Sequence, residues 1–529
     1  MRLTTVGQWI EWAGEYRNLP FIGKYTDARG VPASWEPFWE RAGKPSFVLE
    51  SGKAGRYTYF GMDPVSSVTG KADRACIAEY AEGPMGDERR TIGERRVTGA
   101  PLQTVQSWMA PYRSPSVEGA PPFSGGCVGF WGYDVARSIE RLPAIAEDDL
   151  QLPDYEFMMM KRIWAYDLKE RALYCAVHTF LADEGVPPED ADRRERLERL
   201  YREAEREAGR MADWWNEAVA AAEADELGGE RKRAFELVTR QDALTVEVEA
   251  IPGIDIAFPK PRFLEAVRRI QRYIAQGDVF QVNLSVRQSK RLQSPPEHIY
   301  EWLRLLNPSP YMGLLRFRDY DLVSGSPELL VKTVGGVVET RPIAGTRPRG
   351  GDEAEDRRLE DELLTNEKER AEHIMLVDLL RNDLGRVSRY GTVKVTELMA
   401  IERYSHVMHI VSHVRGTLAE GKDAFDVIAA AFPGGTITGA PKIRTMEIIE
   451  ELEPVRRGPY TGSIGWIDYN GNMELNIVIR TLVVRDGVGY VQSGAGIVID
   501  SVPEKEFAES LNKAKALWKA VLYSENARS

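Results

Sequence analysis

The chain has 529 residues, of which 43% are hydrophobic and 28% are charged, a composition typical of a folded globular protein and not of a disordered one. Its formal net charge is −12, which argues against nucleic acid as the main partner, because a phosphate backbone attracts a basic surface. An anionic small molecule is not excluded, since it needs only a local group of arginines and lysines.

Cysteine usage and apolar runs bear on the compartment. Cys76, Cys127 and Cys175 are far apart and show no CxxC spacing, so neither a disulfide framework nor a zinc site is expected. The N-terminus lacks the apolar run of a signal peptide. No apolar stretch reaches the roughly 20 residues that a membrane helix needs. The sequence therefore predicts a cytoplasmic protein with no membrane contact.

The first region, residues 1–181, is predicted to consist mostly of strands with short helices. Residues 46–51, 56–62 and 172–181 are β-branched or aromatic runs bounded by glycine and polar residues, which is typical of strands. Residues 123–137 contain four glycines among apolar side chains. Glycine at that density favours tight sheet packing over a ligand-binding loop.

The composition changes in residues 182–246, which are rich in Glu, Arg and Ala. Leu197, Leu200, Tyr201 and Ala204 recur at helical spacing, with Glu/Arg pairs on the polar side. This pattern predicts a charged helical insert or a long connection. A charge run of this kind is usually a solvated face, so we assign it no chemistry.

The remaining region, residues 247–529, is predicted to be α+β with a large sheet. Residues 261–278 form a strongly amphipathic helical pattern in which Phe263, Val267 and Ile270 fall on one stripe, and Gly277 follows as a C-terminal stop. Strand and helix patterns then alternate up to a C-terminal helix over residues 503–522. The polar residues gather on glycine-rich connections between these elements.

Two of the predicted helices carry paired carboxylates. Glu369 and Glu372 are three residues apart, and so are Glu506 and Glu509, so each pair lies on one helix face. Residues 374–377, which follow the first pair, are apolar all round and are expected to be buried. Like charges so placed repel each other and raise each other's pKa unless a cation lies between them. One carboxylate from each helix, completed by water and substrate oxygens, is a usual way to hold Mg²⁺.

Helix capping is the alternative reading of these acids. Asn366 and Ser501 each stand three residues before a glutamate, Glu369 and Glu504 respectively, in the capping-box spacing. Capping explains those two glutamates but leaves the other acids on both helices without a structural role. Spacing alone does not decide between a metal site and surface charge.

A glycine-rich loop and an arginine complete the candidate chemistry. Residues 433–442, PGGTITGAPK, precede a helix whose apolar period starts at Ile443, with the cap expected at Thr438 or Gly439. A helix N-terminus behind such a loop attracts anions. It is not a P-loop, because Lys442 is followed by Ile443. Arg480 is expected at the end of an apolar strand over residues 476–480, where it would bind a carboxylate of the protein or of a ligand. Together these features indicate a metal-assisted reaction on a small carboxylate substrate.

At these motifs the sequence resembles the chorismate-utilising enzymes, a family that includes aminodeoxychorismate synthase component I, anthranilate synthase component I, and the isochorismate and salicylate synthases. The resemblance covers residues 258–522 with every motif in order, and the first region resembles the N-terminal part of the first two enzymes. It implies a large two-sheet α/β sandwich with helices outside and the active site in a cleft. The motifs occupy residues 342–350, 366–387, 402–409, 432–442, 476–481 and 493–515.

The resemblance also implies roles for individual residues. Glu372 and Glu509 would hold Mg²⁺, with Glu369 and Glu506 alongside. Glu328 would be the acid that protonates the departing 4-hydroxyl of chorismate. His409 and Thr436 would line the ring. The chorismate carboxylates would be held by Gly345, Thr346, Tyr460, Arg480, Gly494, Ala495, Gly496 and Lys513.

Gln281 bears on the choice of nucleophile. Family members that add water have a lysine at this position, and a neutral amide cannot act as the base that activates water. The resemblance therefore implies an aminating enzyme that receives ammonia from a separate glutamine amidotransferase subunit, because this chain carries no amidotransferase signature. A glycine elbow with a nucleophilic cysteine, for example, is missing from the sequence.

The identity of the product is inferred from likenesses in individual motifs. Ala344, in PIAGT, resembles the anthranilate synthases, whereas many aminodeoxychorismate synthases have a lysine there that attacks the ring. Residues 279–289, 432–442, 450–470 and 476–481 look closer to the aminodeoxychorismate synthases. We expect the latter activity, which serves folate and 4-aminobenzoate biosynthesis, with direct attack by ammonia. Anthranilate synthesis is the alternative, and a non-catalytic subunit that senses chorismate or tryptophan ranks below it.

Two further motifs resemble the tryptophan pocket of the family. In anthranilate synthases this pocket is the feedback site, and in some aminodeoxychorismate synthases it holds a structural tryptophan. An empty apolar pocket is the other interpretation. The residues concerned are Glu50, Ser51, Pro308, Ser309 and Pro310.

Overall fold

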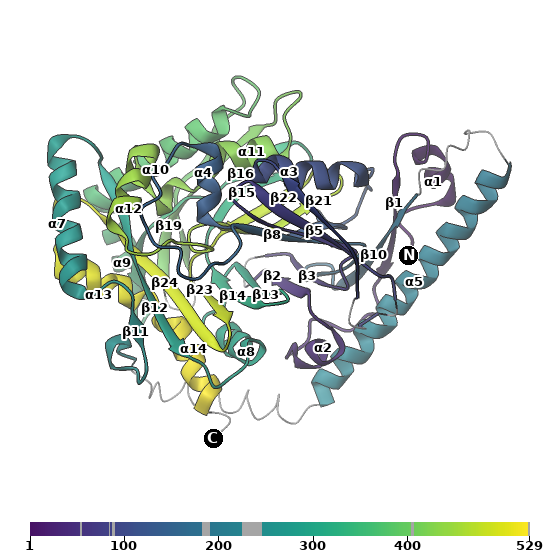
Figure 1. Ribbon diagram of the computed structural model, residues 1–529, viewed down its shortest axis with the longest axis horizontal. Helices are drawn as coiled ribbons and strands as arrows, with labels where there is room; N and C mark the ends of the chain where they lie inside the picture. Colours follow the sequence, from purple (N-terminus) through teal and green to yellow (C-terminus); the bar gives the residue numbers. More distant parts are fainter. Residues whose placement is uncertain are drawn as a thin grey trace.

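The computed structural model describes residues 1–52, 55–83, 85–86, 90–181, 191–224, 246–403 and 407–526. Two large sheets pack face to face, and helices cover their outer faces (Figure 1). Every strand pair within the two sheets of the described chain is antiparallel. The predicted two-sheet α/β sandwich is confirmed.

The first sheet runs from the N-terminal strand to the strands that flank the site. Its order is β1 (Asn18–Tyr25), β10 (Ala172–Phe180), β9 (Arg162–Asp167), β3 (Tyr57–Met62), β2 (Ser46–Glu50), β13 (Tyr311–Arg316), β14 (Tyr320–Ser326), β23 (Thr481–Arg485), β24 (Val488–Ile497), β12 (Gln281–Arg291) and β11 (Asp255–Ile256), with β20 (Gly439–Ala440) also paired to β12.

The second sheet carries the remaining strands. Its order is β17 (Ile343–Pro348), β19 (Val407–Thr417), β16 (Val337–Thr340), β15 (Leu329–Val334), β22 (Met473–Ile477), β21 (Ser463–Asp468), β7 (Gly126–Trp131), β8 (Tyr155–Met160), β4 (Ser66–Lys71), β5 (Arg74–Tyr80) and β6 (Thr91–Thr98), with β18 (Lys394–Arg403) also paired to β19.

Helices and 3₁₀ turns connect these strands. They are α1 (Val6–Trp12), α2 (Glu36–Arg41), α3 (Pro101–Met109), η1 (Ala110–Tyr112), η2 (Tyr133–Val135), α4 (Ala136–Ile139), α5 (Ala191–Ala224), η3 (Val248–Ala250), α7 (Lys260–Gln276), α8 (Pro296–Leu306), α9 (Glu353–Thr365), α10 (Glu367–Gly385), α11 (Ala424–Ala431), η4 (Gly435–Ile437), α12 (Lys442–Leu452), α13 (Pro503–Asn512) and α14 (Lys515–Asn526). No helix in the described part of the chain is long and apolar enough to cross a bilayer.

Both sheets combine strands from the two halves of the sequence. β2 pairs with β13, and β7 pairs with β21. The predicted boundaries at residues 181 and 246 therefore divide the sequence without separating the sheets, and the division into regions stays a prediction.

The layer between the sheets is rich in buried aromatic and aliphatic side chains. Phe47 and Leu315 of the first sheet meet Phe130 and Met158 of the second, all of them fully buried. Burial of large apolar side chains is the dominant favourable term in folding. Gly129 has a packing role, because a Cβ there would lie 1.9 Å from the carbonyl oxygen of Glu156 on the neighbouring strand. The predicted tight sheet packing of this glycine-rich segment is thus confirmed.

The predicted charged helix over residues 182–246 is present as α5, and the flanking residues 182–190 and 225–245 lie outside the described residues. α5 runs along one edge of the molecule beside β1 and β10 (Figure 1). Leu197, Tyr201 and Ala204 are buried, whereas most charged side chains between them are exposed. The apolar stripe therefore docks the helix and the charges face solvent.

The C-terminal half differs from expectation at two helices. α7 ends at Gly277 in the left-handed conformation, as predicted. The single C-terminal helix predicted over residues 503–522 is wrong, because α13 ends at Asn512 and α14 begins at Lys515. The apolar period continues through the break, so it gave no sign of the change in direction.

Candidate active site

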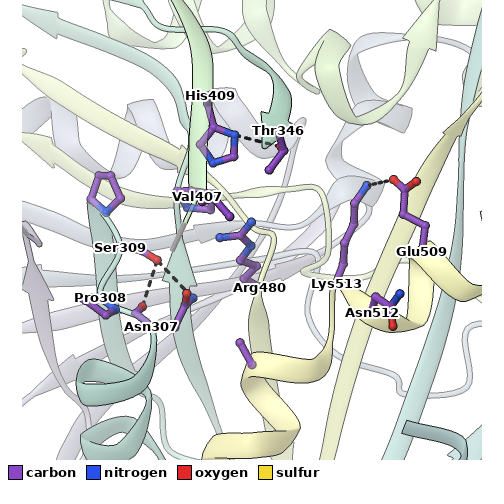
Figure 2. A pocket seen from close by; sticks show the side chains of 13 residues that line it. Asn307, Pro308, Ser309, Thr346, Val407, His409, Arg480, Glu509, Asn512 and Lys513 are labelled. Carbon is purple, nitrogen blue, oxygen red and sulfur yellow. Dashed lines mark hydrogen bonds and ion pairs between the residues drawn. The ribbon is translucent and has the colours of Figure 1, made fainter. Parts of the chain in front are cut away.

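A pocket of about 450 Å³ lies where the loop after α8, strands β17 and β19, the turn before β23 and helix α13 meet (Figure 2). It brings together several residues that the sequence placed in one site. Arg480 points into it, with His409 and Thr346 on one side and Lys513 and Glu509 on the other. Its walls are Asn307, Pro308, Ser309, Pro310, Pro327, Thr346, Val407, His409, Arg480, Glu509, Asn512, Lys513 and Ala516.

Arg480 is a buried cation with unusual backbone geometry. It follows the end of β22 by three residues and is not at the end of a strand, so that expectation was wrong. Its φ is +49°, a strained value for a side chain other than glycine, and such strain clusters at functional sites. Burial lowers the pKa of its guanidinium, and the nearby charge of Glu328 opposes this. Among the described residues no carboxylate is hydrogen-bonded to it, so it can accept a ligand's carboxylate.

Lys513 supplies a second cation at the point where α13 ends. Its Nζ donates to the carbonyl oxygen of Gly494 at 2.9 Å and to Oε1 of Glu509 at 3.0 Å. The ion pair is about half exposed, and exposed pairs contribute little stability. The lysine is therefore free to exchange its carboxylate partner for a ligand at little cost to the fold.

His409 contacts the β17 segment that carries the PIAGT motif. Its Nδ1 lies 3.1 Å from the carbonyl oxygen of Gly345 and 3.0 Å from Oγ1 of Thr346. Burial is the main cause that lowers the pKa of the imidazole, so the ring is neutral at pH 7. Gly345 has φ +60°, and a Cβ there would lie 3.0 Å from Oε2 of Glu369. The motif therefore needs glycine where the chain turns towards α10.

Glu328 is a buried acid next to Pro327 of the pocket wall. Burial raises the pKa of its carboxyl to about 7, while the hydroxyl of Thr436 and the cations Arg480 and Lys513 limit the rise. Thr436 lies in the short 3₁₀ turn η4 of the glycine-rich loop. A carboxyl that is half protonated near pH 7 can act as a general acid.

The glycine-rich loop differs in detail from the prediction. Pro441 is the N-cap of α12, whereas the sequence placed the cap at Thr438 or Gly439. Lys442 forms a 2.9 Å ion pair with Asp383 of α10 and so has a structural partner. This ion pair connects the start of α12, just after the loop that carries Thr436, to α10.

The acids of α10 are held from several sides. Oε1 of Glu372 accepts a 2.9 Å hydrogen bond from Nε2 of Gln281, and Glu369 forms a 3.3 Å ion pair with Arg347. Asn366 caps the helix by accepting from the backbone N–H of Glu369, so the predicted cap is confirmed. The expectation that residues 374–377 are buried all round is wrong, since Ile374 is 47% exposed.

The acids of α13 repel each other. Burial and the charge of Glu509 raise the pKa of Glu506, while Ser501 and Lys368 of α10 oppose the rise. Ser501 does not cap α13, contrary to the capping-box prediction, because Val502 is the N-cap and makes no side-chain bond. The side chain of Ser501 instead accepts from the N–H of Val498.

The two acidic faces approach the same part of β24. A Cβ on Gly496 would lie 2.3 Å from Nε2 of Gln281, the partner of Glu372. Two residues earlier, Gly494 binds Lys513, the partner of Glu509. Gly494, the buried Ala495 and Gly496 therefore form a small-residue floor between the two helices.

The acids fit Mg²⁺ by their chemistry. Within the described ranges no three His, Cys, Asp or Glu side chains already form a cage, but Mg²⁺ keeps much of its shell as water and substrate oxygens. Glu372 is bonded to a neutral amide, and Glu506 and Glu509 repel each other. Oxygen ligands with excess negative charge are what this ion prefers.

The residues of the predicted tryptophan pocket are divided between cavities. Pro308, Ser309 and Pro310 line the main pocket. Glu50 and Ser51 border a small cavity of about 30 Å³ between the sheets, which Pro310 also lines. Glu50 is bound by Arg304 at 2.7 Å and Tyr300 at 2.6 Å, so its carboxylate already has partners. The tryptophan assignment stays a prediction.

Some residues of the site escaped the sequence reasoning. Pro327, Val407, Asn512 and Ala516 line the pocket but were given no role, because none of them belongs to a pattern of charge or spacing. Tyr460, which was predicted, is buried with its ring 5.5 Å from the guanidinium of Arg457. Arg457 was not predicted, although Glu453 four residues earlier is the spacing of a helical ion pair.

A family model described as chorismate binding enzyme matches residues 45–519. The chain belongs to the chorismate binding enzyme family. As an enzyme of this family it has relatives with two different names. It is 47% identical to aminodeoxychorismate synthase component 1 of Bacillus subtilis over 482 residues, which are 91% of this chain and 93% of the relative. It is 44% identical to anthranilate synthase component 1 of Thermus thermophilus over 91% of this chain and 93% of that one.

A solved structure supports the same membership of the chorismate binding enzymes. The crystal structure of anthranilate synthase component I from Streptococcus pneumoniae TIGR4 superposes with a TM-score of 0.65 at 31% identity, covering 88% of this chain and 93% of that one. The predicted family is therefore confirmed, and so is the fold of the anthranilate synthase component I type.

Proposed function

We propose that the protein is component I of aminodeoxychorismate synthase, which converts chorismate and ammonia to 4-amino-4-deoxychorismate and water. The observation that carries the reaction class is the buried acid Glu328, which follows Pro327 of the pocket wall and whose pKa is influenced by the cations Arg480 and Lys513 of the same pocket. The product is supported by the 47% identity to the Bacillus subtilis enzyme of that name.

Substrate binding rests on charge complementarity. Chorismate carries two carboxylates, and Arg480 and Lys513 offer two cations within one pocket. Arg480 has the planar fork that matches a carboxylate bidentately. Thr346 and the floor of Gly494 to Gly496 would complete the binding of the substrate. Tyr460, which is buried beside Arg457, would also contribute.

The chemical step needs a proton for the leaving hydroxyl. The proton of Glu328 leaves with the 4-hydroxyl as water while a bond forms from nitrogen to the same ring carbon. The nitrogen arrives as neutral ammonia and afterwards releases one proton, which restores Glu328. His409, neutral at pH 7, would contact the ring from the β19 side. His409 does not compete for the proton, because burial lowers its pKa.

The metal site would be formed by Glu372 and Glu509, with Glu369 and Glu506 beside them. Mg²⁺, when bound, supplies Lewis acidity and a template for a substrate carboxylate. Gln281 keeps Glu372 in place through its amide. A primary amide has no basic site near neutral pH, so Gln281 cannot generate hydroxide from water, which favours ammonia as the nucleophile.

Ammonia would come from a partner subunit. The relatives are named component 1, which implies a second component, and a glutamine amidotransferase is the class that releases ammonia from an abundant donor. Neutral ammonia is a minor species at pH 7, so delivery from a docked subunit would raise its local concentration.

The product assay tests this proposal. The protein is incubated with chorismate, Mg²⁺ and ammonium, and a lyase that converts aminodeoxychorismate to 4-aminobenzoate is then added. We expect 4-aminobenzoate only after addition of the lyase. Fluorescent 2-aminobenzoate formed without the lyase would refute the product and establish anthranilate synthesis.

Anthranilate synthesis is the second candidate, favoured by Ala344 in the PIAGT motif and by relatives of that name at 39–45% identity. A non-catalytic sensor of chorismate or tryptophan is the third. Glu372→Gln separates the sensor from both enzymes, because it should abolish turnover while chorismate binding and the folded state persist.

A further inference from the structure

A buried ion pair lies directly behind the site. Arg457 and Glu453 are 1% and 3% exposed, and the guanidinium donates to the two carboxylate oxygens from Nε at 2.9 Å and from Nη2 at 2.7 Å. Burying two charges is costly, and the attraction between them repays the cost only when every donor and acceptor is satisfied. A buried ion pair of this kind does not by itself show that the fold is stabilised, so its role is to be judged from its other contacts.

The remaining donors of Arg457 reach three separate segments. Nη1 donates to the carbonyl oxygen of Ile437 at 3.1 Å and to Oγ1 of Thr461 at 3.3 Å. Nη2 donates to the carbonyl oxygen of Asn283 at 2.7 Å. Together with the two bonds to Glu453, these contacts use all five N–H donors of the guanidinium.

Each of these segments carries a proposed site residue. Ile437 follows Thr436, the neighbour of Glu328. Thr461 follows Tyr460 and has φ +61°. Asn283 lies two residues after Gln281 on β12. One guanidinium thus fixes the relative positions of three parts of the site that are far apart in sequence.

Glu453 extends the same arrangement to the floor of the site. Its Oε1 accepts from both the backbone N–H and the hydroxyl of Ser285, each at 2.8 Å. Ser285 in turn accepts a 2.9 Å bond from the side chain of Gln492 on β24. The carboxylate therefore helps to hold β12 against β24 at Gln492, two residues before Gly494.

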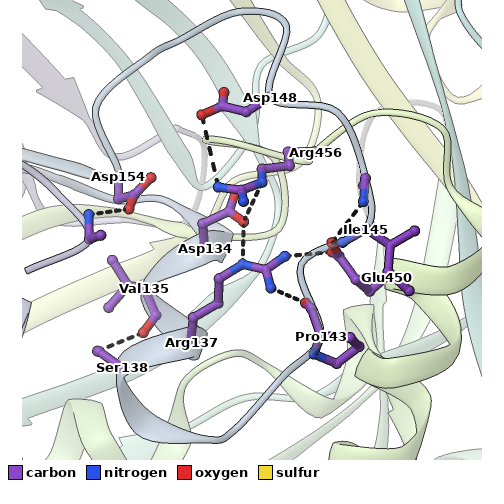
Figure 3. A network of polar contacts seen from close by, with 12 residues as sticks. Asp134, Val135, Arg137, Ser138, Pro143, Ile145, Asp148, Asp154, Glu450 and Arg456 are labelled. Atoms are coloured by element: carbon purple, nitrogen blue, oxygen red, sulfur yellow. Dashed lines mark hydrogen bonds and ion pairs between the residues drawn. The ribbon is translucent and has the colours of Figure 1, made fainter.

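The neighbouring arginine has different partners. Arg456 lies 3.9 Å from Asp134 and 3.9 Å from Asp148 (Figure 3). In the same network Glu450 of α12 accepts from Arg137 and from the N–H of Ile145. The ion pairs of Arg456 therefore reach the N-terminal half, whereas the hydrogen bonds of Arg457 reach segments that carry site residues, although its guanidinium also lies 5.0 Å from the ring of Tyr133.

We propose that Arg457, held in place by Glu453, is a positioning residue of the active site that sets the placement of Thr436, Tyr460 and the Gln281 end of β12. It touches neither substrate nor metal. This inference rests on the proposed function only in taking chorismate as the substrate. Its test measures the consumption of chorismate, whatever product forms.

Arg457→Lys is the main test variant, because lysine keeps the charge but cannot place five donors in one plane. We expect a higher KM for chorismate, a lower kcat and a kcat/KM reduced by about 100-fold, the scale of a misplaced site. Displacement of Thr436 would remove one of the groups that limit the rise in the pKa of Glu328, while Arg480 and Lys513 stay in place. The alkaline fall in activity should then move to higher pH. If the role of Arg457 were merely structural, the variant would contain less active enzyme, but its KM and the pH at which activity falls would be unchanged.

Arg456→Lys is the matched control, and wild-type KM, kcat and pH dependence are expected for it. Thr461→Val is the second variant, in case Arg457→Lys does not fold, because it removes one acceptor and keeps the side-chain shape. Loss of a single hydrogen bond predicts a KM increase of about 3- to 10-fold. Wild-type KM and pH dependence in the folded variants, or equal losses in both lysine variants, would overturn the inference.

The outcome is separable from that of the proposed function. If the wild-type enzyme consumes chorismate but forms no aminodeoxychorismate, the proposed product is wrong, and the comparison of Arg457→Lys with Arg456→Lys still decides the role of Arg457. If aminodeoxychorismate forms and the two variants do not differ, the proposed function stands and the positioning role fails.

Discussion

Nε2 of Gln281 donates a 2.9 Å hydrogen bond to Oε1 of Glu372, so the residue that bears on the choice of nucleophile is also a partner of a proposed metal ligand. Outer partners of this kind orient metal-binding carboxylates. The two properties of the site, the metal and the nucleophile, are therefore connected through one side chain.

Gln281→Lys should weaken metal binding. The ammonium group would pair with Glu372 and compete with the ion, and changes to outer partners typically cost about 10–100-fold in metal affinity. Mn²⁺ binding followed by electron paramagnetic resonance, without substrate, measures the effect. Gln293→Lys, which adds the same charge on the exposed loop beyond the other end of β12, should bind Mn²⁺ as the wild type does. Equal affinity in all three proteins would contradict the connection.

Glu328→Gln should lower kcat by about 10²–10⁴-fold, the usual contribution of a general acid. Only the protonated carboxyl can donate, and burial raises its pKa to about 7, so wild-type kcat should fall as pH rises through 7. Steady-state kinetics between pH 5.5 and pH 9 at saturating chorismate and ammonia check both statements. A wild-type kcat that rises throughout this range would exclude Glu328 as the acid.

The same substitution should change how stability depends on pH. The pKa of Glu328 is raised from its ordinary value of 4.5 to about 7, so the folded state holds a proton that the unfolded state has lost. The stabilisation is complete below pH 4.5 and is lost as pH rises through 7, a change of about 3 kcal/mol at 1.36 kcal/mol per pKa unit. Urea unfolding at pH 5 and pH 8 should therefore show a smaller decline for Glu328→Gln than for the wild type. Parallel declines would mean that the carboxyl is not desolvated.

Arg480→Lys should raise the KM for chorismate while the fold stays intact. Lysine keeps the charge but loses the bidentate fork, and a hydrogen bond to a charged group contributes about 1.5–3 kcal/mol, or roughly 10- to 150-fold in affinity. Because no carboxylate of the described chain is bonded to Arg480, the free energy of unfolding should not fall. Isothermal titration with chorismate and thermal unfolding measure the two quantities. A large loss of stability with unchanged affinity would indicate a structural arginine.

The sequence anticipated the parts of the site that reside in local patterns. The acids on α10 and α13 were visible from their spacing, and Glu328, His409 and Arg480 from the motifs. The sequence did not predict which distant segments lie next to each other in the folded chain. The pairing of β2 with β13 joins segments about 260 residues apart, and no periodicity records such a pairing. The break between α13 and α14 lies inside a continuous apolar period, and Arg457 acts through backbone oxygens, which carry no residue signature.

No covalent intermediate should form between the protein and the substrate. Among the described residues that line the pocket, Lys513 is the one amine, and its Nζ donates to both Gly494 and Glu509. An ammonium group so bonded has no free electron pair for attack on the ring. Ala344 stands where many aminodeoxychorismate synthases have the attacking lysine.

Intact-mass measurement after acid quenching, with chorismate and Mg²⁺ but without ammonia, tests this directly. The mass of the wild-type protein should be unchanged. Ala344→Lys is the matched variant, because it restores an amine at the position from which related enzymes attack, and an adduct confined to that variant would support direct amination by the wild type. An adduct on the wild-type protein that Lys513→Met removes would instead make Lys513 the nucleophile, and the buried acid Glu328 would then serve two successive substitutions at the ring.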